Sequence, residues 1–131
     1  MPVRIPPRLA GSSFAHVLGA FFVMGSWGFF ANSAHGAEAA ITAGIVQGVL
    51  SACITLTLKT FVERLAPRFS GRAALWGPPA LAALIAGALL TMLHRLSGTP
   101  EVLYTVALPL SAATGYAAIY NYTLWRSRKA E

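Results

Sequence analysis

Four long apolar runs, joined by short segments rich in Gly, Pro and basic residues, dominate the sequence. A helix needs about 20 predominantly apolar residues to cross the hydrocarbon core of a bilayer, and each run comes close to that length. Only 11% of the residues are charged, whereas a soluble domain carries about a quarter. The sequence therefore predicts a single all-α membrane domain, residues 1–131, with four transmembrane helices in an antiparallel bundle. The expected spans are 14–31, 39–61, 80–96 and 102–124.

The stretch 37–65 is the one around which we expect the other helices to pack. Polar side chains recur along it at a spacing of four, which places them on one helix face; they are Gln47, Ser51, Thr55, Lys59 and Glu63. Gly44 and Gly48 form a G-x-x-x-G pair on a neighbouring face, where another helix backbone can approach closely. Polar groups are costly against lipid tails, so this side is expected to face protein or a cavity. Cys53 is the single cysteine, and we expect it to be a small buried residue.

The first apolar run has two interpretations. Ser12 or Ser13 suits a helix cap after a basic, proline-containing arm with Arg4 and Arg8. The same arm, the apolar run and Ala34-His35-Gly36 also resemble a secretory signal with a cleavage site between small residues. The run is long for a signal peptide, which favours a retained helix.

The third and fourth runs carry turn and packing signals. Pro78 or Pro79 fits the first turn of a helix that then continues as 80–96. Thr99-Pro100-Glu101 is typical of a helix start, and Pro109 is expected to bend the fourth helix. Small residues at a spacing of four mark the faces expected to pack against other helices; they are Ala83 and Gly87 in the third run and Ala107, Ser111 and Gly115 in the fourth.

Basic residues predict the topology. Nine of the ten Lys and Arg residues fall on one side of the four spans, and Arg95 alone falls on the other. Because basic residues remain on the cytoplasmic side, both termini are expected there. The basic residues flank apolar segments instead of forming one patch, which argues against a nucleic-acid partner.

The first candidate site combines the polar stripe of the second span with polar residues of the fourth. Its members are Gln47, Ser51, Thr55, Lys59, Thr105, Ser111 and Tyr116. They are hypothesised to line a substrate path or a lipid-headgroup slot, with Lys59 attracting an anion. The alternative is that they form hydrogen bonds between helices, with Lys59 reaching the interface and pairing loosely with Glu63.

The second candidate site is a rim of polar residues at the opposite, outer end. Its members are Asn32, His35, Glu38, His94, Arg95, Glu101 and Tyr104. Two His and two Glu could bind a metal ion or supply acid–base groups. Their spacing matches no metal or catalytic motif, so the alternative is a hydrated rim of loop residues. We assign no catalytic residue, metal or cofactor from the sequence.

Function is only weakly constrained. A small proton-coupled multidrug exporter has a similar size, but it needs a carboxylate deep in the membrane, and none is present here. The chain resembles the general run of small four-span proteins of the bacterial inner membrane. The leading hypothesis is a transport or lipid-handling component that acts as an oligomer. The alternatives are a non-catalytic subunit or scaffold of a larger membrane complex, and an intramembrane enzyme that uses the outer rim. Membrane lipids, self-association or a larger protein are the expected partners.

Overall fold

A computed structural model describes the chain from residue 7 to residue 131, and the side chains from residue 13 onward. The elements in this range are α1 (Pro7–Asn32), η1 (Ser33–His35), α2 (Ala37–Leu65), η2 (Ala66–Arg68), α3 (Ala73–Leu96) and α4 (Val102–Ala130). All four α-helices are long and apolar enough to cross a membrane. The expectation of an all-helical chain with four membrane-length helices is therefore confirmed.

The start of the chain differs from the expectation. Helix α1 already begins at Pro7, so its N-terminus is upstream of Ser12 and Ser13. Arg4 lies outside the described residues, and so does the side chain of Arg8.

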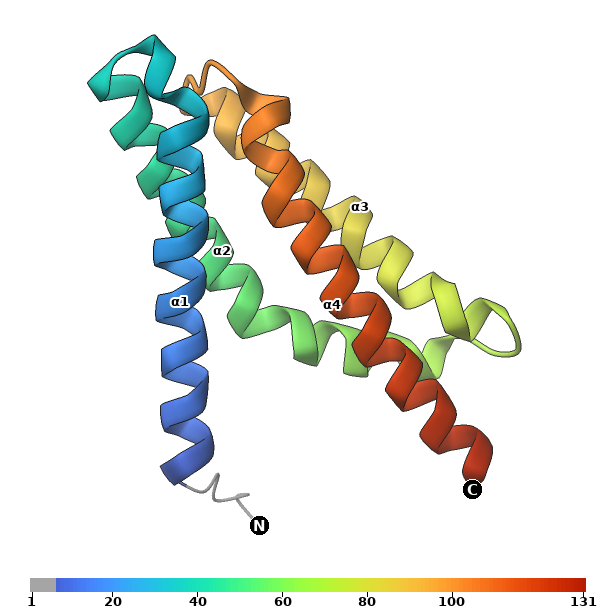
Figure 1. Cartoon of the computed structure of the whole chain (residues 1–131). Coiled ribbons are helices and arrows are strands. Elements are labelled where there is room, and N and C mark those ends of the chain that lie inside the picture. Colours follow the sequence, from blue (N-terminus) through green and yellow to red (C-terminus); the bar gives the residue numbers. More distant parts are fainter. Residues whose placement is uncertain (1–6) are drawn as a thin grey trace.

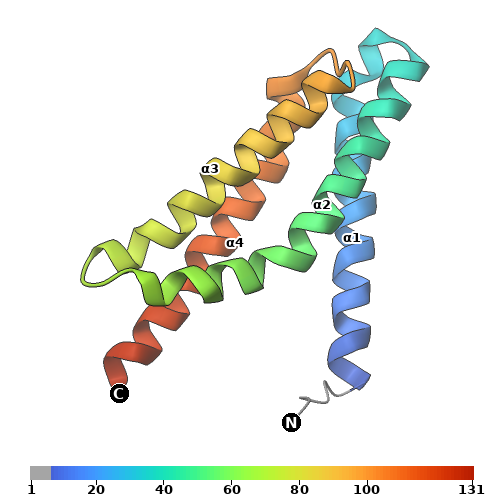
Figure 2. The same ribbon diagram turned by 180° about the vertical axis from the view of Figure 1, so that it is seen from behind.

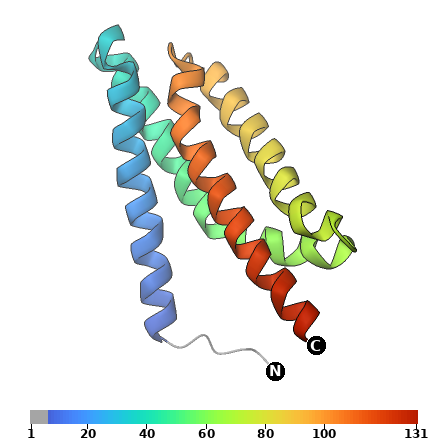
Figure 3. The same ribbon diagram turned by 45° about the vertical axis from the view of Figure 1, so that its right-hand side comes forward.

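The four helices are close together at one end of the molecule, and towards the other end α1 diverges from α4 and from the connection between α2 and α3 (Figure 1). The close end, which we call the loop end, holds η1 and the turn 97–101 between α3 and α4. At the opposite end, the termini end, α1 begins and α4 ends, well separated from each other (Figure 3). Helix α2 bends at mid-length and crosses from α1 towards α3 and α4, so that it bridges the spreading helices (Figure 2).

Glycines allow α1 and α2 to pack almost backbone to backbone. A Cβ atom at Gly28 would lie 2.9 Å from the Ala43 carbonyl oxygen, and one at Gly44 would lie 3.0 Å from the Gly25 carbonyl oxygen. A Cβ atom at Gly48 would come equally close to α1. Close approach of this kind gives van der Waals contact and is typical of small-residue faces in membrane helices.

Helix α3 is longer than expected, because Pro78 and Pro79 lie inside it and not at its start. A proline has no N–H group, so these two residues leave the carbonyl groups of Ala74 and Leu75 without their helical donors. The side-chain amide of Asn121 on α4 donates to both carbonyl oxygens, at 2.9 and 2.7 Å. A single buried side chain therefore replaces the two main-chain hydrogen bonds that the proline pair removes.

Pro109 removes a main-chain hydrogen bond from α4 in the same way, and a side chain of α1 replaces it. The proline leaves the Thr105 carbonyl without its helical donor. The indole Nε1–H of Trp27 donates to this oxygen at 3.2 Å, and also to the Tyr104 oxygen at 3.3 Å. Helix α4 continues through Pro109 to Ala130, and the pronounced bend is in α2 (Figure 2).

Helix α2 carries a hydrogen bond of the kind that often bends helices. Within it, Thr57 Oγ1 donates to the Cys53 carbonyl at 2.9 Å. The Cys53 side chain is exposed on the protein surface, not buried as expected.

Candidate functional site

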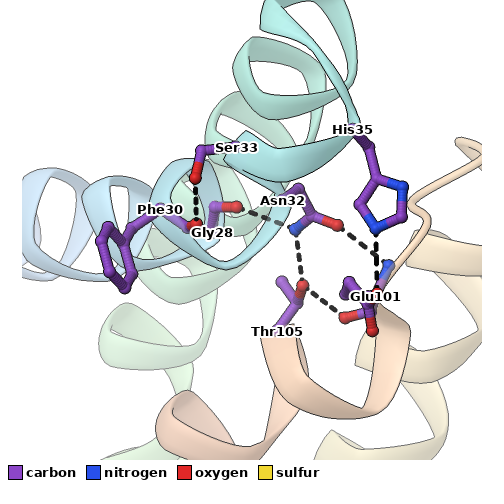
Figure 4. Close-up of polar contacts among 7 residues, drawn as sticks. All are labelled: Gly28, Phe30, Asn32, Ser33, His35, Glu101 and Thr105. Atoms are coloured by element: carbon purple, nitrogen blue, oxygen red, sulfur yellow. Dashed lines mark hydrogen bonds and ion pairs between the residues drawn. The ribbon is translucent and has the colours of Figure 1, made fainter.

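At the loop end, Asn32 at the last position of α1 connects α1 to α4. Its amide Nδ2 donates to the Thr105 hydroxyl at 2.7 Å and to the Gly28 carbonyl at 2.8 Å. Its Oδ1 accepts from the main-chain N–H of Glu101 at 2.9 Å. Figure 4 shows this buried amide between the two helices, with His35 beside the Glu101 carboxylate on the outside. His35 Nε2 lies 2.9 Å from Glu101 Oε1.

A second buried hydrogen-bonded chain connects α2 to α3. His94 Nε2 lies 2.8 Å from Gln47 Oε1, and the Gln47 amide nitrogen donates to Ser51 Oγ at 2.8 Å. The other ring nitrogen of His94, Nδ1, lies 2.8 Å from Thr99 Oγ1. All four side chains are buried, and His94 and Gln47 are 0% exposed. We call this chain, Thr99–His94–Gln47–Ser51, the His94 chain.

These contacts combine residues that the sequence assigned to two separate sites. Gln47 of the expected stripe pairs with His94 of the expected rim, and Thr105 of the stripe pairs with Asn32 of the rim. His94 is fully buried, so it belongs to the helix packing and not to a hydrated surface. Glu38 is exposed at the start of α2, with no hydrogen bond or ion pair to the other rim residues in the described part of the chain.

Thr99 has a different role from the expected helix cap. Helix α4 begins at Val102, and the residue before it, the N-cap Glu101, makes no side-chain capping hydrogen bond. The Thr99 hydroxyl faces His94 instead.

A groove of about 710 Å³ lies between α1, α2 and α4. This volume is within the range of pockets that hold small molecules. The groove follows from the fold: α1 and α4 spread apart towards the termini end (Figure 1), and α2 passes between them. Its described lining includes four members of the expected stripe; they are Ser51, Thr55, Lys59 and Tyr116.

The polarity of the groove changes along its length. Towards the termini end, its lining includes Ser13 and His16 of α1, Lys59 and Thr60 of α2 and Tyr116 of α4. Towards the loop end, the lining is mainly apolar, and it ends near Ser51, where the His94 chain begins. The groove is therefore amphipathic: its part towards the termini end is polar, and the rest is mainly apolar. We call the polar part the entrance.

Lys59 gives the entrance its charge. Its side chain is 60% exposed, and its Nζ lies 4.0 Å from Glu63 Oε1, the loose pair that the sequence suggested. The Glu63 carboxylate also accepts a hydrogen bond from the Tyr120 hydroxyl. No Asp or Glu lines the groove in the described part of the chain. An exposed pair of this geometry has a weak mutual attraction, so Lys59 remains available to an anion.

The other residues of the sequence hypotheses are placed as follows. Ser111 is exposed and donates to the Ala107 carbonyl of its own helix. Gly44 and Gly48 face α1, and Ala83 and Gly87 lie near Leu110 of α4. Among the described residues, no atom from another part of the chain lies within 4 Å of the Cβ position of Gly115.

Sequence reasoning missed three residues that the structure makes important. Two of them, Trp27 and Asn121, donate hydrogen bonds to carbonyl groups whose helical donor is missing because of a proline. The third, His16, lines the groove. For the first two, the prolines themselves were the signal, since each predicts a carbonyl that needs a new donor.

Comparison with models of known protein families, with curated proteins and with solved structures finds no match for this chain. Within the described residues, no group of three or more His, Cys, Asp or Glu side chains is placed to hold a metal ion. The geometry of the groove and of the His94 chain is therefore the basis for proposing a function.

Proposed function

We propose that the protein is a transport or lipid-handling component that binds an anionic amphiphile in the groove between α1, α2 and α4. The observation that carries the proposal is the amphipathic lining of this groove, with Lys59 at its polar entrance. In a membrane, a groove between two diverging helices opens to the lipid phase. An amphiphile can then enter sideways, with its acyl chain against apolar residues and its headgroup at the entrance.

The chemistry of the entrance favours a negatively charged headgroup. Lys59 supplies the positive charge, and the hydroxyl groups of Thr55, Thr60 and Tyr116 line the same part of the groove. An ammonium group and hydroxyl donors are typical partners of phosphate oxygens. A phospholipid with an anionic headgroup, such as phosphatidylglycerol, is the occupant with this combination of features.

Removing the charge of Lys59 tests the proposal. We expect Lys59→Gln to lower retention of a single bound phosphatidylglycerol about fivefold, because one basic residue near an anionic lipid surface contributes about 1 kcal/mol. The measurement is native mass spectrometry of the protein released from nanodiscs that contain equal amounts of phosphatidylglycerol and phosphatidylcholine.

Arg64→Gln is the matched control, since Arg64 is an exposed basic residue of the same helix and does not line the groove. It should leave the single retained phosphatidylglycerol unchanged. Equal losses in the two variants would show that the lipid is held by general surface charge, and the groove would not be the site.

We also propose that the termini end faces the cytoplasm and that the membrane is a bacterial inner membrane. Nine of the ten basic residues lie on the termini side of the spans, which supports this orientation. An alkaline phosphatase fusion at the C-terminus should be inactive, and the same fusion placed after residue 98 should be active. Activity in the first fusion and its absence in the second would reverse the orientation.

The other functional hypotheses stay predictions. The Gly44 and Gly48 face packs within the chain, so it gives no particular support to a scaffold or an oligomer. The rim that an enzyme would use is divided between the His35–Glu101 pair and the buried His94.

A further inference from the structure

His94 is an ionisable residue buried in a helix long and apolar enough to span the membrane, and it does not line the groove. It is 0% exposed and lies near the end of α3. Ionisable side chains in this environment are costly and commonly mark sites of proton binding or ion passage. The contacts of its ring therefore need an explanation.

The hydrogen bonds around His94 define its protonation state. The Gln47 amide nitrogen donates to Ser51, so the Gln47 oxygen is the acceptor that faces His94 Nε2. His94 Nε2 must then carry a hydrogen. In the neutral ring Nδ1 has none, so it accepts from the Thr99 hydroxyl.

The same partners can also hold the protonated ring. A proton that binds at Nδ1 makes this nitrogen a donor, and the Thr99 oxygen then accepts from it. The Thr99 hydroxyl hydrogen must rotate away, and Ser97 Oγ lies 3.4 Å from the Thr99 oxygen. Ser97 Oγ donates to the His94 carbonyl, so its oxygen is free to accept the rotated hydrogen. Both protonation states of His94 are thus satisfied by hydrogen bonds, and only one hydroxyl has to turn.

A proton has a short route to this ring. Nδ1 faces the turn 97–101 at the loop end, where Ser97 is partly exposed. At the loop end, the charged groups and histidines on the elements around the ring are Arg95 of α3, Glu38 of α2, Glu101 of the turn and His35 of η1; the other charged residues of α2, Lys59, Glu63 and Arg64, lie towards the termini end. The four side chains at the loop end are exposed, and Glu101 is engaged by His35.

On the other side of the ring, the His94 chain leads to the groove. A positive charge on His94 polarises the Gln47 amide, which donates more strongly to Ser51 at the groove wall. Screening is weak in this buried region. The His94 chain reaches the groove at its apolar loop end, whereas the headgroup is placed beside Lys59 at the other end, so the added charge favours the anion at a distance, through the poorly screened interior, and not by contact.

We propose that His94 is a proton-binding site whose protonation strengthens the binding of the anionic occupant of the groove, an inference that rests on the proposed function. Binding free energies are reciprocal, so the occupant must also favour protonation of His94. Coupling between two binding sites typically changes affinity by about fivefold or more. A fivefold change corresponds to a shift of about 0.7 pH unit in the midpoint of the His94 titration.

The test is nitrogen NMR of the full chain with ¹⁵N-labelled histidine rings. The signals of the three histidines are assigned with His16→Gln and His35→Gln variants. At the alkaline end of the titration His94 should show one protonated nitrogen, Nε2, and at the acidic end it should show two. In nanodiscs that contain phosphatidylglycerol, the midpoint for His94 should lie higher than in pure phosphatidylcholine.

An anionic bilayer also concentrates protons at its surface, so the shift needs an internal reference. His35 is exposed at the loop end and reports this general effect. The inference is supported if the lipid shifts His94 by about 0.7 unit more than His35 and if Lys59→Gln removes the excess. A ring that stays neutral to about pH 4, or a shift equal to that of His35, overturns it. Failure of the proposed function is seen separately, as lipid retention that does not depend on Lys59.

Discussion

Replacing Gly28 by leucine is expected to separate α1 from α2 and to destabilise the protein by about 3 kcal/mol. The position has no room for a side chain, because even a Cβ atom would lie 2.9 Å from both the Ala43 carbonyl oxygen and Gln47 Cβ. Main-chain atoms of α2 cannot rotate away as a flexible side chain does. The two helices must therefore move apart along their whole contact, and the hydrogen bonds of Asn32 and Trp27 to α4 are strained with them.

Gly19→Leu is the matched control. Gly19 lies on the same helix, and outside its own stretch of helix no atom of the described residues lies within 4 Å of its Cβ position, so leucine there should cost less than about 1 kcal/mol. Both variants can be compared by SDS titration in mixed micelles, followed by circular dichroism. Equal stabilities would mean that α1 and α2 are not in contact at Gly28 in the membrane.

The second large effect is expected from Asn121→Leu. The substitution keeps the approximate volume but leaves the carbonyls of Ala74 and Leu75 without a donor in a buried, apolar setting. An unsatisfied buried polar group costs about 1–3 kcal/mol, so the two together should cost about 3 kcal/mol. The same SDS titration measures the loss.

A double-mutant cycle isolates this contact from simple loss of packing. Pro78→Ala with Pro79→Ala restores the main-chain N–H groups that pair with the two carbonyls. In that background Asn121→Leu should cost less than about 1 kcal/mol, because the carbonyls are satisfied within α3. A cost as large as in the native chain would show that Asn121 stabilises the protein through packing alone.

The helices of this protein are readable from its sequence because they are set by hydropathy. Helix α2 has the expected bounds, Ala37–Leu65, since its apolar body, flanking glycine and polar ends act locally. Helix α3 was placed too short, because the rule that proline pairs belong at a helix start assumes that no other donor is available. The donor that overrides the rule is Asn121, more than forty residues later.

The candidate site was harder to read, because it depends on which helix faces meet. Hydropathy places His94 beside Arg95 at the end of a span, and nothing local shows that one side chain turns inward and the other outward. That difference arises when α3 packs against Gln47 of α2. The groove depends on the divergence of α1 from α4, which is a property of the assembled helices and leaves no periodic pattern in any one of them. For the same reason, Gln47→Leu is a poor test of function alone: Gln47 is fully buried between His94 and Ser51, so its loss also affects folding.

The hydrogen bonds that replace those lost at the prolines have a consequence for how the protein is made. A ribosome completes α3 before it has synthesised Asn121, so at that moment the carbonyls of Ala74 and Leu75 have no protein donor. If α3 enters the bilayer before Asn121 is available, its transfer from water carries the free-energy cost of two unpaired carbonyl groups in hydrocarbon. Helix α3 therefore reaches its full stability in the bilayer only together with α4. Helix α4 in turn depends on Trp27 of α1, which has by then already emerged. Because of the prolines, the stability of each helix in the bilayer depends on which helices have already been made. Helix α4 completes the hydrogen bonding of α3, and α1 completes that of α4.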